Sequence, residues 1–363
     1  MRKKLQAKSS VRAQYKDWCV PKRGNANPER QTNDVWSWLV ETRVGAYTAH
    51  EAAGAGERVY PGWCFARYGQ SETVLADGTK IYIGGEHEDH YDPDFYIYND
   101  VVAVRPDASV EIFGYPKDVF PPTDFHSATL VGDKVYIIGG LRYPESRSDH
   151  ETQIYQLELE GFSIHRVEVN GQAPSWLYDH KAELNESGTK IVCTGGQVTH
   201  HQAQRTVENL TTWEFDLETL TWATAGSEVA TRWVLVREDE SYNELFGIQT
   251  VARASRSSRL DKFAERYKAE FAQRGHVVDA ELFYSRFQPP IPHSPVAIDR
   301  DGDEFKVHRI LIDGVIVRYV EDMHEIAVTV EGELSGDTIE VLKRHGLETY
   351  SRLEGLPYKC ILL

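Results

Sequence analysis

The densest group of side chains that could bind a metal ion lies at residues 86–94, in the run Glu-His-Glu-Asp-His-Tyr-Asp-Pro-Asp. In an extended strand alternate side chains share a face, so His87 and Asp89 would point one way and His90 the other. Nitrogen and oxygen ligands of this kind suit zinc, manganese or iron. We therefore predict His87, Asp89 and His90 as candidate ligands of a divalent metal ion. The spacing fits no closed zinc motif, and the alternative is a loop that bonds its own backbone.

A second set of candidates consists of two Asp-His groups. Asp124 lies beside His126, and Asp179 beside His180, and the two groups fall at the same register when the chain is aligned on its paired glycines. Histidine and aspartate brought together could act as acid and base, or bind a metal ion. The alternative is structural, with a polar side chain at this register tying one repeat to the next.

The elements that must position these residues are repeats closed by double glycines. The pairs are Gly84-Gly85, Gly139-Gly140 and Gly195-Gly196, and their first glycines are 55 and 56 residues apart. A constant period near this length indicates a repeat architecture. Glycine is expected where strands crowd together or where φ must be positive.

Each repeat contains four predicted strands, which is the content of one propeller blade. The repeats span residues 67–113, 125–169 and 179–223. Residues 232–238 and 244–251 predict a further hairpin, either a degenerate fourth blade or a closing element. Three blades cannot close a ring, because propellers usually have about 4 to 8, so the number of blades stays open.

The chain resembles a bacterial kelch-repeat family of uncharacterised function. The resemblance rests on the glycine pairs, on residues 86–95, on the block from Tyr115-Pro to Pro121-Pro-Thr-Asp-Phe-His126, and on the tail around residues 307–320. It covers most of residues 33–363 and implies a kelch-type β-propeller. Kelch propellers mostly bind proteins, and a few are enzymes, including the galactose oxidases. The copper ligands and crosslinked cysteine of those oxidases have no counterpart here.

The predicted fold is mainly β, with a helix before the propeller and an α+β domain after it. Residues 1–31 are expected to form a basic irregular arm, and residues 32–62 a helical lead-in with a helix over 34–52. Residues 63–255 are expected to form the kelch-like blades. Residues 256–295 would form a helix and a proline-rich linker, and residues 296–363 a small α+β domain.

Charge and composition narrow the class of partner. The chain carries a net charge of −16, although residues 1–30 hold nine Lys or Arg and only two Asp or Glu. An acidic body disfavours nucleic acid and favours basic partners. The four cysteines are scattered, which suits a reducing cytosol. The sequence shows neither a signal peptide nor an apolar run long enough for a membrane span, so we expect a cytoplasmic protein.

These observations leave three hypotheses for function. The first is a cytosolic protein-interaction module that binds, and could neutralise, a basic partner through loop aromatics, namely Tyr91, Phe95, Tyr96 and Tyr143. The second is a metal-dependent enzyme or metal-binding protein, whose His and Asp side chains converge at the mouth of the propeller channel. The third is an assembly role for the C-terminal domain. The sequence leaves the oligomeric state open.

Overall fold

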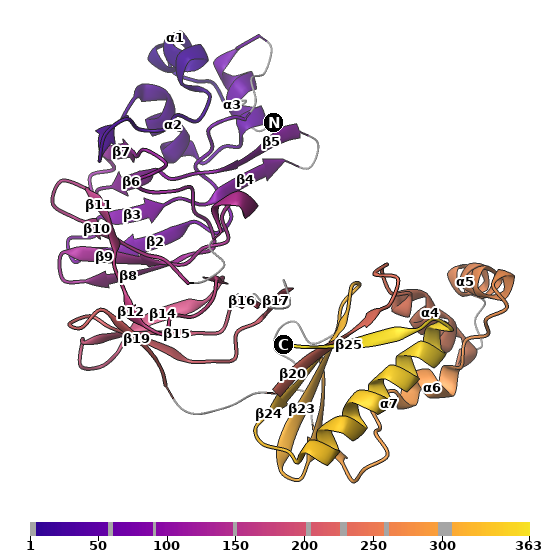
Figure 1. The fold of residues 1–363 in the computed structure, drawn as a ribbon. Helices are drawn as coiled ribbons and strands as arrows, with labels where there is room; N and C mark the ends of the chain where they lie inside the picture. The colour runs from indigo at the N-terminus through magenta and orange to yellow at the C-terminus, as the bar shows by residue number, and fades with distance from the viewer. Residues whose placement is uncertain are drawn as a thin grey trace. The chain divides into compact units, whose positions relative to one another are not determined.

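The computed structural model describes residues 5–56, 61–89, 92–147, 151–200, 205–225, 231–257, 261–296 and 307–363. The chain divides into two compact units, Met1–Gly226 and Ser227–Leu363. The described residues are mainly β, with mostly antiparallel sheets and seven α-helices (Figure 1). The sequence predicted that the blades continue to residue 255, whereas the first unit ends near residue 226.

Three four-stranded sheets, one for each repeat, form the body of the first unit (Figure 1). The first sheet contains β2 (Ser71–Val74), β3 (Lys80–Ile83), β6 (Val101–Val104) and β7 (Val110–Gly114). The second contains β8 (Ser127–Val131), β9 (Lys134–Ile138), β10 (Ile154–Glu158) and β11 (Ile164–Val167). The third contains β14 (Lys181–Leu184), β15 (Lys190–Thr194), β18 (Trp213–Asp216) and β19 (Thr221–Thr224). The predicted four strands in each repeat are confirmed.

Smaller strands either add a fifth strand to the first and third sheets or form small sheets of their own. The first repeat inserts a hairpin of β4 (Glu86–Asp89) and β5 (Asp92–Ile97) between its second and third strands. The third repeat inserts β16 (Gln197–His200) and β17 (Arg205–Glu208) at the equivalent place, and β13 (Leu177–Tyr178) pairs with β16. The short strand β12 (Asn170–Gly171) runs parallel to β19, and a 3-10 turn, η1, spans Pro144–Ser146.

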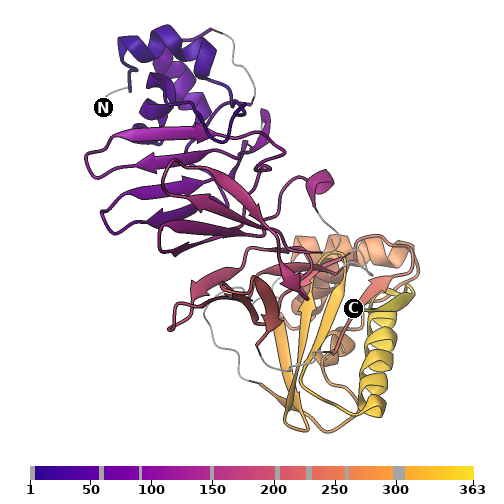
Figure 2. The same cartoon turned by 60° about the vertical axis from the view of Figure 1, so that its left-hand side comes forward.

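The sheets stack face to face, and apolar side chains from facing sheets pack together between them. Ile81 and Ile83 of β3 pack against Val135 and Ile137 of β9. The opposite face of the second sheet packs its alternate side chains, such as Ile138, against the third sheet. The innermost strands β2, β8 and β14 are neighbours in that order, and Figure 2 shows the sheets layered in sequence order. The described residues form no closed ring of sheets.

The glycine pairs stand where one sheet touches the next. A Cβ atom on Gly84 would lie 2.2 Å from the carbonyl oxygen of Thr123, and one on Gly139 would lie 2.0 Å from that of Leu177. Both glycines also have positive φ, +56° and +67°. Two separate constraints therefore require glycine there, as the sequence predicted.

The outward surface of the third sheet, which we call the end face, is polar. Thr194 stands where the first two sheets place Ile83 and Ile138, and it is exposed. Glu183 beside it is also exposed, and Lys190 pairs with Glu214 across the face at 2.7 Å. Terminal repeats of stacked arrays need such a polar surface, so this chemistry does not favour the packing of a fourth sheet.

Three helices cover the opposite end of the stack: α1 (Ser9–Trp18), α2 (Asp34–Thr42) and α3 (Ala46–Ala53). The prediction of an irregular arm over residues 1–31 is wrong, because Val11, Tyr15 and Trp18 form an apolar stripe on α1 that packs on this layer. The single helix predicted over residues 34–52 is interrupted, since Arg43 adopts a left-handed conformation with φ of 53°.

Residues 23–32 run along the outer edges of the first two sheets, and we call them the N-terminal strap. Within the strap, β1 (Glu29–Arg30) pairs with β7. The amide of Asn27 bonds both backbone groups of Ile164 on β11, at 2.8 and 2.9 Å. Open strand edges invite unwanted pairing, so the strap protects two of them.

The second unit is a six-stranded antiparallel sheet with four helices packed into its core (Figure 1). In spatial order the strands are β21 (Ser294–Pro295), β22 (Val307–Ile312), β23 (Val315–Glu321), β24 (Ile326–Glu331), β20 (Thr231–Arg237) and β25 (Tyr358–Leu362). The helices are α4 (Leu245–Ser255), α5 (Lys262–Gln273), α6 (Ala280–Ser285) and α7 (Gly336–Glu354). The predicted hairpin at Asp313-Gly314 is confirmed, and both residues have positive φ.

Two predictions fail in the second unit. Residues 232–238 and 244–251 do not form a hairpin of a fourth blade, because β20 pairs with β24 and β25 and the second segment is helical. Ile248 and Val251 on α4 are buried at helical spacing. The helix predicted within residues 256–295 is confirmed as α5. The proline-rich stretch after it is not a linker between domains, because Ser294 pairs with β22 and the preceding Phe271 and Phe283 already lie in the core of this unit.

Candidate functional site

The two histidines predicted to converge tie neighbouring sheets together. His126 directly precedes β8, and its Nε2 lies 2.8 Å from the hydroxyl of Ser71 at the start of β2. His180 directly precedes β14, and its Nε2 lies 2.9 Å from the hydroxyl of Ser127 at the start of β8. Each histidine thus contacts the serine one repeat earlier. These contacts agree with the structural alternative, in which a polar side chain at this position of the repeat ties one repeat to the next.

Burial sets the protonation of both rings. Each histidine is only 7% exposed. Burial lowers the pKa of His126 to about 3, with the charges of Arg142 and His180 acting in the same direction. Burial lowers the pKa of His180 to about 4. Both rings are therefore neutral at physiological pH, and their Nδ1 atoms are buried without a hydrogen-bond partner.

The two aspartates of this set have different surroundings. Asp124 is fully buried, and its Oδ1 accepts a hydrogen bond from the backbone N–H of Arg142 at 2.6 Å. Burial raises the pKa of Asp124 above its ordinary value. Asp179 is exposed, and its backbone N–H donates to the carbonyl of Phe125 at 2.7 Å. The two carboxylates therefore do not share one environment.

Two of the three candidate metal ligands lie outside the described side chains. His87 is half-buried on β4. The side chain of Asp89, and residue His90 as a whole, lie outside the described residues. Among the side chains that the structure describes, no group of three or more His, Cys, Asp or Glu is placed to bind a metal ion.

Two of the four predicted partner-binding aromatics contact one another. Phe95 on β5 is 44% exposed, and its ring meets that of Tyr143 edge-on at 5.8 Å. Tyr96 is half-buried beneath the guanidinium of Arg23, 4.4 Å from the ring centroid, and burial raises the pKa of Tyr96 to about 12. Tyr91 lies outside the described residues.

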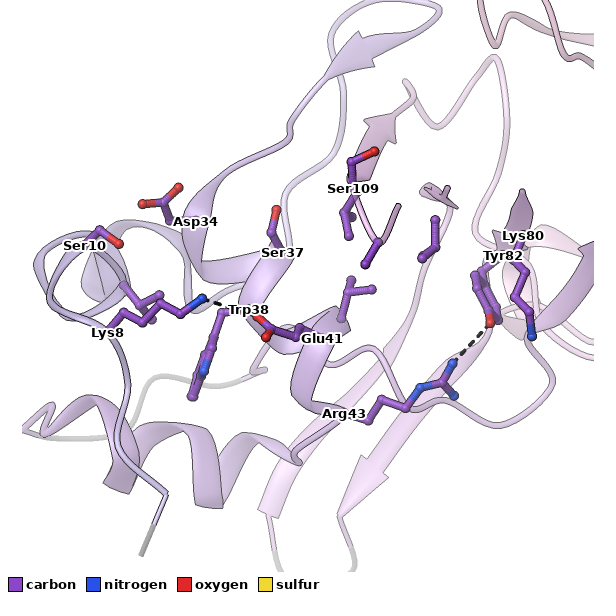
Figure 3. Close-up of a pocket in the computed structure, with 15 residues that line it drawn as sticks. Lys8, Ser10, Asp34, Ser37, Trp38, Glu41, Arg43, Lys80, Tyr82 and Ser109 are labelled. Atoms are coloured by element: carbon purple, nitrogen blue, oxygen red, sulfur yellow. Dashed lines mark hydrogen bonds and ion pairs between the residues drawn. The ribbon is translucent and has the colours of Figure 1, made fainter. Parts of the chain in front are cut away.

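The first unit contains a pocket of about 820 Å³ that was not predicted from the sequence, and we call it the interlayer pocket. It opens between the helices α1 and α2 and the tips of β3, β6 and β7 (Figure 3). Its apolar lining consists of Val11, Trp38, Val40, Val104, Ala108 and Val110. Its polar lining consists of Lys8, Ser10, Asp34, Ser37, Glu41, Arg43, Lys80, Tyr82 and Ser109.

The charged residues of the pocket are arranged in pairs along its rim. Lys8 on the α1 side reaches Glu41 of α2 at 3.6 Å, and both are exposed (Figure 3). Arg43 donates a hydrogen bond to the Tyr82 hydroxyl at 3.1 Å (Figure 3). Burial, followed by a hydrogen bond to Glu72, raises the pKa of Tyr82. Exposed pairs of this kind are weak, so a ligand can replace them at little cost.

The conformation of Arg43 follows from its place at the end of α2. Its left-handed φ lets its N–H close the last turn on the carbonyl of Leu39. The guanidinium then lies over the rings of Phe65 and Tyr82, at 5.1 and 5.7 Å. Helix termination and cation–π contact therefore fix one wall of the pocket.

The lining of the pocket combines apolar side chains with hydroxyl and charged groups. The pocket presents three serines, Ser10, Ser37 and Ser109, but neither histidine nor cysteine is among its lining residues. A serine nucleophile needs an adjacent base. The pocket instead offers an apolar wall beside hydroxyl groups and charges of both signs, which suits a polypeptide segment.

Comparison with known proteins identifies a family for residues 23–229. No curated protein sequence matches the chain. One similar solved structure is described as a novel fungal alcohol oxidase with catalytic diversity among the AA5 family, in complex with copper. It is 12% identical with a TM-score of 0.30, and the match covers 47% of this chain and 41% of that one, less than half of its length. No helix within the described ranges is long and apolar enough to cross a membrane.

The family model describes the KLHDC2/KLHL20/DRC7 Kelch-repeats domain and matches residues 23–229. The match begins in the N-terminal strap and includes all three glycine-closed sheets. Kelch repeats are generally protein-interaction modules. Because the match covers more than half of the chain, this protein belongs to that Kelch-repeat family.

Proposed function

We propose that this chain is a protein-interaction module that holds a segment of its partner in the interlayer pocket. The observation that carries the proposal is the pocket itself, about 820 Å³ between a helical layer and the first kelch sheet. The three sheets would be successive blades of a kelch-type propeller that is left open at the polar end face. The exposed Phe95 and the half-buried Tyr143 would form a second contact surface on the same unit.

The lining explains how a segment would be held. An apolar side chain of the partner would pack against Trp38 and Val110 at the pocket wall. The partner's backbone and polar groups would form hydrogen bonds with the serine hydroxyls. Its charged groups would replace the ion pair between Lys8 and Glu41 at the rim. Burying apolar area supplies affinity, and the few polar groups fix orientation.

A basic partner fits the charge of the chain. The net charge of −16 steers positively charged molecules towards the protein and raises their association rate at low salt. The four cysteines are free thiols, as suits a module that acts in the reducing cytosol and neutralises a basic protein there.

A pocket-filling substitution tests the proposal. Ser37 is half-buried on α2 and lines the pocket, so Ser37→Trp should fill it without disturbing the core. We expect the immobilised wild type to retain a partner from a lysate of its source cells, more strongly at low salt. Ser37→Trp should lose at least about tenfold of that retention, which corresponds to about 1.4 kcal/mol.

Two variants serve as comparisons. Ser187→Trp adds the same ring to an exposed turn of the third sheet and should bind like the wild type. Phe95→Ser tests the aromatic pair. Equal retention by Ser37→Trp and Ser187→Trp would contradict the pocket as the binding site, and loss in Phe95→Ser alone would move it to the loop aromatics.

A further inference from the structure

The second unit exposes an apolar cluster that its own fold does not use. Tyr242, Phe246 and Met323 are 60%, 72% and 65% exposed. They are neighbours, because the N–H of Asn243 donates to the carbonyl of Met323 at 2.8 Å and the Tyr242 ring lies 4.5 Å from that of His324. Exposed apolar side chains gathered in one place mark interaction surfaces.

Phe246 stands between two hollows. One hollow, of about 420 Å³, lies between α4 and α5 and is floored by Gly247, Tyr267 and Phe271. The other, of about 170 Å³, is bounded by Leu245 of α4 and by residues of α6 and the β23–β24 turn. Each hollow combines aromatic side chains with polar and charged ones. A phenylalanine ridge between two such hollows suits two apolar side chains that follow one another along a helix with polar residues.

The charge around the hollows is mainly acidic. Their lining includes Glu244, Glu270, Glu321 and Asp322 against a single cationic residue, Arg274. Arg274 pairs with Glu244 at 2.5 Å, Glu270 pairs with Arg266 at 2.9 Å, and Glu321 pairs with a neighbouring arginine. Asp322 has no ion-pair partner among the residues that the structure describes. A partner with Lys or Arg beside its apolar side chains would therefore be complementary.

From this arrangement we propose that the second unit binds a basic amphipathic helix of a partner protein. Two apolar side chains of that helix, one turn apart, enter the hollows on either side of Phe246. Its basic residues lie beside Glu270 and Asp322. The helical form is favoured because helices and a turn supply most of the lining and offer no strand edge to an extended segment. This site is independent of the interlayer pocket.

A designed peptide tests the site directly. The probe is a labelled 14-residue peptide of leucine and lysine at helical spacing, titrated with the full chain and followed by fluorescence anisotropy. We expect saturable binding that Phe246→Asp weakens at least about tenfold. Glu270→Gln with Asp322→Asn should weaken it several-fold at low salt and less at high salt, since screening removes the same attraction.

The controls isolate the ridge. Phe263 on α5 is 68% exposed and lines neither hollow, so Phe263→Asp should change the dissociation constant less than twofold. A peptide with glutamate in place of lysine should not bind. Circular dichroism should match for both aspartate variants, because each replaced ring is exposed.

Four outcomes would overturn the proposal. They are equal weakening by Phe246→Asp and Phe263→Asp, no weakening by Phe246→Asp, tight binding of the glutamate peptide, or a dimer that Phe246→Asp dissociates. The dimer would assign the surface to a second copy of this chain. The Ser37→Trp variant should bind the peptide normally, so failure here leaves the interlayer pocket unaffected.

Discussion

Gly139→Ala is expected to destabilise the first unit by about 2–5 kcal/mol. The new methyl group would meet the carbonyl oxygen of Leu177 at 2.0 Å, on the neighbouring repeat. The two backbone segments cannot move apart freely, because the N–H of Gly140 donates a hydrogen bond to the same carbonyl oxygen of Leu177 at 3.1 Å. Overpacking costs about 1–3 kcal/mol, and the left-handed φ of +67° adds about 1–2 kcal/mol for a residue with a Cβ.

Gly132→Ala separates these two costs. Gly132 lies in the turn between β8 and β9 of the same sheet with φ of +62°, and nothing lies within 4 Å of its missing Cβ. The Gly132→Ala variant should therefore lose only the stability that corresponds to the left-handed conformation, about 1–2 kcal/mol. Urea unfolding followed by tryptophan fluorescence measures both. Equal losses would mean that the sheets approach less closely at Gly139 than the structure shows.

Acid is expected to weaken the first unit through its two buried histidines. Burial lowers the folded-state pKa values of His126 and His180 to about 3 and about 4, below the value of about 6.5 in an unfolded chain. The unfolded state thus binds more protons below about pH 6.5. Stability is fully present above that pH and is lost as pH falls towards the folded-state values.

The size of the effect follows from the same values. At pH 4.5, about two units below the unfolded-state pKa, each histidine should lower the free energy of unfolding by about 2.5–3 kcal/mol, at about 1.4 kcal/mol per unit. Replacing both by glutamine keeps a hydrogen-bonding side chain and removes the titration. The double variant should lose less stability between pH 7.5 and pH 4.5 than the wild type, by several kcal/mol.

The exposed His165 on β11 provides the control, and His165→Gln should leave the pH dependence unchanged. Buried Asp124 acts in the opposite direction, because burial raises its pKa, but it is present in every variant. Tryptophan fluorescence follows the first unit, which holds seven of the chain's eight tryptophans. Parallel pH dependence in wild type and double variant would mean that the histidines titrate freely in the folded protein.

Much of the architecture was predictable because its signals are local. Paired glycines such as Gly84-Gly85 mark the contact between sheets, and Asp313-Gly314 marks a tight turn. The helix α1 was missed because its stripe of Val11, Tyr15 and Trp18 is short and surrounded by charge. The helix α4 was mistaken for a strand, since its valine and isoleucine favour strands until tertiary packing decides.

The candidate sites were less accessible to sequence reasoning. The histidine register could be read from the repeats, but whether His126 converges with other ligands or bonds Ser71 depends on how the sheets stack. The interlayer pocket draws on residues as distant as Lys8 and Val110, and no local pattern records such a meeting.

The polar end face implies that the length of this kelch array is set by surface chemistry at its terminus. A ring fixes its number of members by geometry, whereas a capped stack accepts an extra member wherever two apolar faces already meet. A duplicated repeat inserted between the second and third sheets would leave both termini intact and extend the protein. Apolar residues in place of Thr194 and Glu214 would instead make the end face apolar, and separate molecules could then stack end to end.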